Sequence, residues 1–547
     1  MRGNFDNSGK LVRFILRRER IVSAIWVVAL VLFSMAVAPA IEGMFSEPEA
    51  RMQFAESFDN PVMVAMMGPV YGIDNYTTGV MYAGTMLLWA IIAVAVMNIF
   101  LVVRHTRADE ERGRVEVIRS LPSGRLSILN AAMICAGIVN AALAVLLGLA
   151  LAAMGIEGMD LASSMLYGLT VGASGFVFAA VAALFSQLSS NKGGATGLSF
   201  LALAVFYLLR AAGDVQGSEA LARISPLGLA QRSQAFVGNY VWPVLVLLAE
   251  TAVVAAAAYA LNSVRDMGQG FISARPGRGA AAKGLLSPFG LSARLLRNTL
   301  VIWIIVMFVL AASYGSVIAD IPEFVGESPE YLQVIGIPEA VANTMAQSEK
   351  AQVIIDYFGV FVVTMMTLVC LVPVIIASLK LRSEEREGRA EQIFALAVPR
   401  LRYLSGFVIL AFAASVLIPL AAALGLYSAT AVAESSPFAF GGLIGAFMVY
   451  LPAIWVMIGA AVFLVGLFPR AAGAVWGFYG FVFIVALLGG MPGLLPEWLQ
   501  NISPMKHIPK LPLEEMTFAP LIVLAAIAFA LCAVGFVSFG KRDSAAG

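Results

Sequence analysis

Charged residues are scarce in this chain of 547 residues. Asp, Glu, Lys and Arg make up 13% of it, whereas a soluble globular domain carries roughly 25%. The hydrophobic share is 60% and the formal net charge is only +1. This composition excludes a soluble globular enzyme and a disordered protein, and the near-zero net charge excludes a protein that binds nucleic acid.

Cysteine and histidine are scarce as well. The three cysteines all lie inside apolar runs, and only two histidines occur; they are Cys135, Cys370, Cys532, His105 and His507. Three scattered thiols provide neither a disulfide framework nor a metal site. We therefore expect no bound metal ion in this chain.

The sequence also lacks a phosphate-binding loop. That motif needs the spacing GxxxxGK[ST], so that backbone amides surround the phosphates and the lysine neutralises them. The glycine-rich stretches at 190–197 and 277–284 do not have this spacing and are typical of a tight turn and a flexible linker. We expect no ATP site and no enzyme activity in this chain, so energy for transport must come from a partner or from an ion gradient.

Long apolar runs dominate the sequence instead. They are about 20 residues long, as a membrane-spanning helix requires, and they show no strand-like alternation of apolar and polar residues. Because only helices or closed barrels satisfy the backbone in lipid, the sequence predicts an all-α polytopic membrane protein. We predict twelve transmembrane helices, at 21–41, 78–103, 126–153, 164–188, 195–212, 241–263, 299–319, 353–379, 403–428, 438–466, 471–490 and 516–539.

The residues ahead of the first predicted span are basic and partly apolar. The run SGKLVRFILRRER within residues 1–20 predicts an amphipathic helix that lies on the membrane surface. A basic start can also belong to a signal peptide, but Ala-Pro-Ala-Ile at 38–41 is a poor cleavage site. We therefore expect the segment to be retained.

The distribution of Lys and Arg predicts which loops are cytoplasmic. Acidic residues gather instead in the loops 42–77 and 320–352. By the positive-inside rule, both termini are expected in the cytoplasm. Of the 35 basic residues, 28 lie in the predicted cytoplasmic segments 1–20, 104–125, 189–194, 264–298, 380–402, 467–470 and 540–547.

The chain also contains an internal repeat with a period near 277 residues. Residues 107–125 and 382–400 share identities at an offset of 275, and Ile-Ser-Pro occurs at both 224–226 and 502–504. We predict two six-span halves, 1–263 and 299–547, joined by a basic cytoplasmic linker at 264–298. An even number of spans gives both halves the same orientation, so the repeat is predicted to be parallel.

The duplicated loops lie between the second and third predicted spans of their halves. Read as helices, they carry opposite charges about one turn apart, at Arg107, Glu110 and Arg114 and again at Glu385 and Arg389. Each loop also has an apolar pair at i, i+3 and a central glycine where a bend is possible. Such amphipathic helices are suited to docking in a groove of another protein, whereas the alternative is a solvated loop or interfacial helix.

Two runs carry a resemblance to a known family. They are MMGPVYGIDNYTTGVMYAG at 66–84 and RHTRADEERGRVEVIRSLPSGR at 104–125. They resemble the permeases of actinobacterial ABC exporters for polyketide antibiotics and other drugs, which include the tetronasin-type exporters. The resemblance covers the whole chain at the level of twelve spans in two halves, and it is motif-specific around 66–125 and weaker at 382–400.

The resemblance implies a fold and a location. The fold is that of type V (ABC-2) exporters, in the plasma membrane of a bacterium. A short re-entrant hairpin is implied before the last span of each half, for which 213–240 and 491–515 are candidates.

The resemblance also implies partners. Two copies of a separate ATP-binding subunit, which bind ATP and Mg, couple to the two cytoplasmic helices, and hydrophobic drugs or antibiotics are moved out of the cell. No nucleic acid is involved, and lipids surround the chain. The residues implied in coupling are Arg107, Glu110, Gly113, Arg114, Glu116, Ile118, Leu121, Arg382, Glu385, Gly388, Arg389, Glu391, Ile393 and Leu396.

By the same resemblance, the second and fifth spans of each half line the translocation path. Methionine and aromatic side chains are frequent there and suit a plastic cavity for varied apolar substrates, although packing or lipid contact is the alternative role for each. Together with an acid in the sixth span, the candidates are Met86, Trp89, Met97, Phe206, Tyr207, Glu250, Met365, Met366, Trp476 and Tyr479.

Two other functions remain open from the residues alone. A secondary transporter driven by an ion gradient needs ionisable residues near the membrane midplane, and the spans hold few, namely Glu250, Asp356 and Arg210. The loop motif GxxxDRxGRR of major-facilitator transporters is also not matched. A polytopic membrane enzyme needs paired carboxylates or a histidine–acid cluster at a membrane face, and the acidic residues here are scattered.

Overall fold

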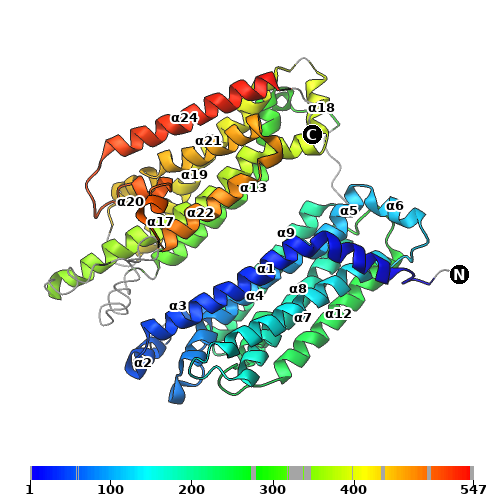
Figure 1. The fold of residues 1–547 in the computed structure, drawn as a ribbon, viewed down its shortest axis with the longest axis vertical. Helices are drawn as coiled ribbons and strands as arrows, with labels where there is room; N and C mark the ends of the chain where they lie inside the picture. Colours follow the sequence, from blue (N-terminus) through cyan, green and yellow to red (C-terminus); the bar gives the residue numbers. More distant parts are fainter. Residues whose placement is uncertain are drawn as a thin grey trace. The chain divides into compact units, whose positions relative to one another are not determined.

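The computed structural model describes residues 3–272, 279–316, 347–432, 438–488 and 495–542, except 57, 59, 60 and 397, and the single residues 318 and 337. The chain forms two compact units, Met1–Gly277 and Arg278–Gly547, each built of helices (Figure 1). Within the described residues, the β-structure is limited to an isolated bridge between Ser189 and Ile272. The boundary between the units falls inside the basic segment 264–298.

The first unit contains six long helices and several short ones. The long helices are α1 (Ser8–Met44), α4 (Thr78–His105), α7 (Ser127–Ala153), α8 (Leu161–Leu188), α9 (Lys192–Val215) and α12 (Trp242–Val264). Between them lie α2 (Pro48–Glu56), α3 (Pro61–Met67), η2 (Ile73–Asn75), α5 (Arg107–Glu111), α6 (Arg114–Ser120), α10 (Glu219–Ile224) and α11 (Pro226–Gln231).

The second unit follows a similar order. Its long helices are α13 (Pro288–Gly315), α17 (Gln347–Arg386), α19 (Arg400–Val432), α21 (Leu451–Leu467) and α24 (Phe518–Lys541). Its shorter helices are η3 (Lys283–Leu286), α18 (Arg389–Phe394), α20 (Phe440–Met448), η4 (Pro469–Ala471), α22 (Ala474–Leu488), α23 (Glu497–Gln500) and η5 (Pro504–His507).

Eleven helical stretches in the described chain are long and apolar enough to cross a membrane. They overlap eleven of the twelve predicted spans, so the chain is a multi-pass membrane protein. The span predicted at 471–490 corresponds to α22, which is shorter and ends at Leu488. Residues 489 and 490, and most of the acidic loop 320–352, lie outside the described residues.

The predicted surface helix within residues 1–20 differs from the structure. It is the first part of α1, which runs from Ser8 to Met44. No break separates it from the predicted span at residue 21, because no glycine or proline occurs between Gly9 and Pro39. Ile15 of this part is buried and packs against α7 at Ala131 and Cys135. The basic start of α1 is therefore attached to the helix bundle and does not form a separate element.

Helix α8 lies at the centre of the first unit and packs against α4, α7, α9 and α12. The helix backbones approach closely there. A Cβ atom on Gly168 of α8 would lie 2.2 Å from the carbonyl oxygen of Ala144 in α7, so only glycine fits there. Small residues let helices approach closely in lipid, where the hydrophobic effect does not drive helix association. Nearby, Asn98 of α4 and Asn140 of α7 exchange two hydrogen bonds of 2.8 and 3.0 Å in the buried core.

The second unit has two closely packed helix pairs, α13 with α19 and α21 with α24. Gly425 of α19 makes the first contact possible, because a Cβ atom there would lie 2.1 Å from the carbonyl oxygen of Phe308. Between these pairs lies a large buried core that includes Phe407, Phe447 and Met457. Each unit thus has its own core.

Candidate functional site

The two duplicated loops differ from the continuous helices read from the sequence. We name them the first repeat segment (residues 107–121) and the second repeat segment (residues 382–396). In the first, α5 and α6 are separated at Gly113, whose φ is 69°. In the second, α17 ends at Arg386 and α18 starts after Gly388, whose φ is 71°. This left-handed conformation favours glycine, so both predicted bends occur at the predicted glycine.

A glutamate stands at the centre of the first repeat segment. Arg107 donates to the Glu110 carboxylate at 2.8 Å, which is the i, i+3 pair expected from the sequence. Arg265, which directly follows α12, donates to the same carboxylate oxygen at 2.8 Å. The backbone N–H of Gly268 donates to the other oxygen at 2.7 Å. Through Arg265 and Gly268, Glu110 connects the first repeat segment to the end of the unit's last helix. Arg107, the other partner of Glu110, is buried.

The second repeat segment has the same arrangement. Arg382 and Glu385 form an i, i+3 ion pair of 3.4 Å. Arg542, which directly follows α24, donates to the other oxygen of the Glu385 carboxylate. In both units, an arginine directly after the last helix thus binds the glutamate of the repeat segment, although the two arginines share one oxygen only in the first unit.

A second ion pair is also duplicated, but it is not the predicted one. Arg114 donates to Asp109 at 2.9 Å, and Arg389 donates to Glu384 at 2.6 and 2.8 Å. The hydrogen bond with Glu384 raises the pKa of Arg389 above its usual value. The expected pairing of Arg389 with Glu385 at i, i+4 is wrong, because the left-handed glycine turns the chain out of a single helix.

Apolar side chains of the repeat segments remain in contact with solvent. Leu121 is 59% exposed and Leu396 is 62% exposed, whereas Ile118 and Ile393 are half-buried. In each predicted apolar pair, the isoleucine is therefore half-buried and the leucine is exposed. Leu121 lies just beyond the end of α6, in extended backbone. Glu116 and Glu391 are exposed. Both leucines are therefore accessible on the surface of the chain.

The first unit carries a buried ionic cluster that the sequence analysis did not identify. His105 at the end of α4 lies 2.8 Å from Glu19 of α1, and Arg104 donates to Glu19 at 2.9 Å. Arg18 donates to Asp109 of the first repeat segment at 2.6 Å. This cluster connects α1 with the first repeat segment.

A signal for this cluster was present in the sequence. At the repeat offset of 277, Arg18 and Glu19 align with Leu295 and Leu296. A charged pair that replaces two leucines in an otherwise similar position indicates a local polar partner. The information lies in this difference between the two copies of the repeat and not in their identities.

The candidates for the substrate path lie in both units. In the first unit, Met86, Trp89 and Met97 lie on α4, and Phe206 and Tyr207 on α9, two helices that contact each other. Met97 and Met366 are buried in the packing, whereas Trp89 is 46% exposed. In the second unit, Met365 and Met366 lie on α17, and Trp476 contacts Tyr479 edge to face on α22.

Glu250 of α12 and Arg210 of α9, both expected as ionisable residues within spans, do not form an ion pair with each other. Arg210 lies 3.6 Å from Asp214 and donates to the carbonyl of Ala65 in α3 at 2.7 Å. One carboxylate oxygen of Glu250 is buried and has no hydrogen-bond partner among the described residues. Its role in substrate recognition stays a prediction.

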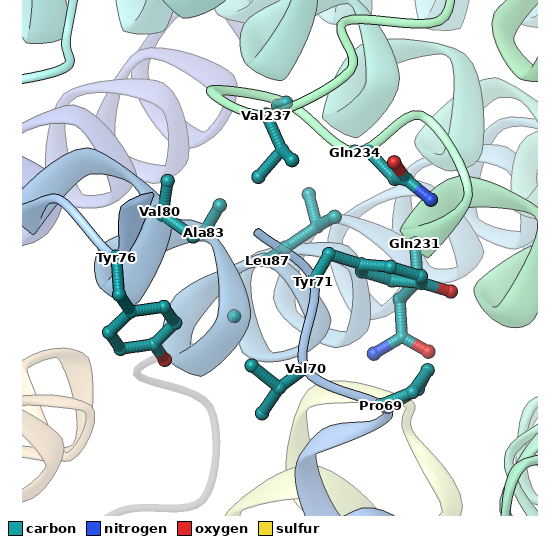
Figure 2. A pocket seen from close by; sticks show the side chains of 12 residues that line it. Pro69, Val70, Tyr71, Tyr76, Val80, Ala83, Leu87, Gln231, Gln234 and Val237 are labelled. Atoms are coloured by element: carbon teal, nitrogen blue, oxygen red, sulfur yellow. The ribbon is translucent and has the colours of Figure 1, made fainter. Parts of the chain in front are cut away.

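A small cavity lies at the other end of the first unit, between the start of α4 and the loop after α11 (Figure 2). Tyr71, Tyr76 and Gln231 line it with apolar side chains. Its volume of about 30 Å³ accommodates a water molecule but not a drug. Burial raises the pKa of both tyrosines, so their hydroxyl groups stay protonated. None of the substrate-path candidates lines this cavity.

The sequence is similar to those of known proteins. A family model described as the C-terminal domain of the multidrug efflux system permease Rv1217c matches residues 10–261 and 285–540. The chain is similar to the multidrug efflux system permease protein Rv1217c of Mycobacterium tuberculosis, with 34% identity over 550 residues. The alignment covers 98% of this chain and 95% of that protein.

Proposed function

The chain belongs to the multidrug efflux permease family, and from this membership we propose that it is the membrane subunit of an ATP-driven exporter of hydrophobic or amphipathic drugs. A permease of an efflux system is a transport subunit rather than an enzyme, and it works with partner components. We propose that these are two copies of a separate ATP-binding subunit, which bind ATP and Mg²⁺.

We further propose the architecture of a type V (ABC-2) exporter of the tetronasin type. The chain then has twelve transmembrane helices in two parallel repeats, with α22 and its neighbouring residues as the eleventh. Both termini and both repeat segments face the cytoplasm of a bacterial cell. The two segments matched by the family model, 10–261 and 285–540, are of similar length and support this division.

The duplicated ion pairs are the observation that carries this proposal. In each unit, one glutamate of the repeat segment binds an arginine directly after the unit's last helix. The second ion pair, across the glycine bend, is duplicated as well. A loop that is only solvated does not require these two ion pairs, because exposed ion pairs contribute little to stability. Two copies of one arrangement fit two identical partners.

The arrangement suggests how force is transmitted. When the two ATP-binding subunits close on ATP, they draw α6 and α18 with them. Glu110 and Glu385 then pull on the ends of α12 and α24, while the bends at the two glycines keep α4 and α17 free to change angle. The halves move about their pseudo-twofold axis, and the path opens alternately to the two sides of the membrane.

The composition of the complex tests this function. The tagged chain of 57.9 kDa is purified from its native membranes in mild detergent and examined by native mass spectrometry. We expect one permease with two copies of an ATP-binding subunit. Proteoliposomes of this complex should move a hydrophobic fluorescent dye with ATP and without an ion gradient. A complex without an ATPase, or transport by a proton gradient alone, would favour a secondary transporter.

A further inference from the structure

A groove lies between the start of α1 and the first repeat segment. Its volume is about 410 Å³. Its apolar wall is formed by Phe14 of α1 and by Val117 and Ile118 of α6. Its rim is lined by Arg18, Arg112 and Arg114. Phe14 is 54% exposed and Val117 is 67% exposed. The groove therefore offers open space bordered by apolar side chains that gain from being covered.

Ion pairs hold the two walls of the groove in place. Arg18 of α1 donates to Asp109 at 2.6 and 3.1 Å, and Arg114 donates to the same carboxylate at 2.9 Å. Asp109 is thus compensated by two arginines, and the exposed Arg112 adds a further positive charge at the rim. The groove is preformed and electropositive, so it complements an apolar side chain next to a carboxylate.

The position of the groove favours a protein rather than a lipid as the occupant. Phe14 precedes the predicted first span, which begins at residue 21, by seven residues, or about 10 Å of helix. The headgroup layer on each side of a bilayer is only roughly 5–8 Å thick. In the proposed orientation, the groove opens into the cytoplasm beyond the lipid headgroups.

The second unit does not repeat the residues of this groove. At the repeat offsets, Arg112 aligns with Glu387 and Val117 aligns with Gln392. Arg18 aligns with Leu295. The charge at the rim is therefore reversed in one position and lost in another, and the most exposed apolar side chain becomes polar.

We propose that this groove receives an apolar side chain, flanked by a carboxylate, from one of the two ATP-binding subunits. The inference rests on the proposed function and adds to it that the two identical subunits dock with different contacts. The subunit at the first repeat segment is held by the groove as well as by α6. The subunit at the second repeat segment lacks this contact, so it dissociates first.

Two variants of the complete complex test the groove. Val117→Asp places a negative charge in the apolar wall, and Arg112→Glu reverses the rim. Both positions are exposed, so the chain is expected to fold, as judged by its elution in size-exclusion chromatography. Each variant should weaken one of the two ATPase copies by about tenfold or more, seen as a complex with a single copy by native mass spectrometry.

The matched controls are Gln392→Asp and Glu387→Arg at the aligned positions of the second unit, which lacks the groove residues, so both ATPase copies should stay bound as in the wild type. If the wild type retains two copies and both groove variants do so too, the groove proposal is wrong while the proposed function stands. A wild type that binds no ATPase overturns both. Loss of a bound lipid from the Val117→Asp variant, with both ATPase copies retained, would assign the groove to lipid.

Discussion

Glu110 of α5 and Arg265, the residue after α12, form an ion pair of 2.8 Å that joins two segments 155 residues apart in the chain. Glu385 and Arg542 form the equivalent pair in the second unit. These four side chains are mostly buried. Removal of one partner leaves a buried charge without compensation, which makes the pairs sensitive points for mutation.

Charge reversal at Glu110 should release the first repeat segment from α12. In Glu110→Lys, two arginines and a lysine meet in a buried site, and we expect binding of the ATP-binding subunit to weaken at least about tenfold. Pull-down of the ATPase by the detergent-solubilised variant measures this effect. Asp74→Lys, at an exposed acid of η2 outside both repeat segments, is the control and should bind normally. Equal loss in both variants would mean that net charge, not the ion pair, matters.

The exposed leucines of the two repeat segments should be required for assembly. In the double variant Leu121→Asp/Leu396→Asp, two charges enter the proposed interfaces, and we expect the complex to be lost while the helix bundle stays folded. Transport in proteoliposomes and native mass spectrometry report the two effects. Leu286→Asp, at an exposed leucine of η3, is the matched control. Normal transport by the double variant would show that the two repeat segments do not bind the ATP-binding subunits.

The bends at the two glycines should be needed for coupling. Gly113→Ala and Gly388→Ala meet no steric obstacle, but their left-handed backbone costs about 1 kcal/mol for alanine. We expect a lower rate of drug-stimulated ATP hydrolysis with an unchanged melting temperature of the helix bundle. Gly284→Ala, which also has open space but no positive φ, should behave as the wild type. Full drug stimulation of ATP hydrolysis in both glycine variants would show that coupling does not need the left-handed backbone at these positions.

The isolated chain should neither bind nor hydrolyse ATP. It has no phosphate-binding loop, so backbone amides and a lysine are not arranged to hold the phosphates. Equilibrium dialysis with radiolabelled ATP, and a phosphate-release assay on the chain separated from its partners, measure both properties. The assembled complex serves as the positive control. Micromolar ATP binding by the chain alone would contradict the proposed division of labour.

Glu250 provides a test of substrate recognition. Its unpartnered carboxylate oxygen lies in α12, and a charge within a span is costly unless it faces water or a partner. We expect Glu250→Gln to be tolerated structurally and to leave the set of exported drugs unchanged, because the second half does not repeat this acid. Drug susceptibility of cells that express the variant at wild-type level measures the outcome. A changed drug spectrum would instead place Glu250 on the substrate path.

The sequence alone determined the class of the protein and the location of its candidate site. Apolar runs of spanning length predict helices, because the backbone in lipid must satisfy its own hydrogen bonds. Eleven predicted spans correspond to helices of the described chain that are long and apolar enough to cross a membrane. The identities between residues 107–125 and 382–400 pointed to the two repeat segments, and the i, i+3 ion pair of Arg107 with Glu110 followed from helical spacing alone.

Contacts between distant segments were decided only by the tertiary structure. Glu110 pairs with Arg265, which follows the last helix of the unit. Arg114 pairs with Asp109 across the left-handed turn at Gly113, a conformation that a regular helix does not contain. The attachment of α1 to the first repeat segment depends on Glu19 and its buried partners in α4 and α5. Local spacing fixes which residues share a helix face, but the partner of a buried charge is set by the packing of helices far apart in the chain.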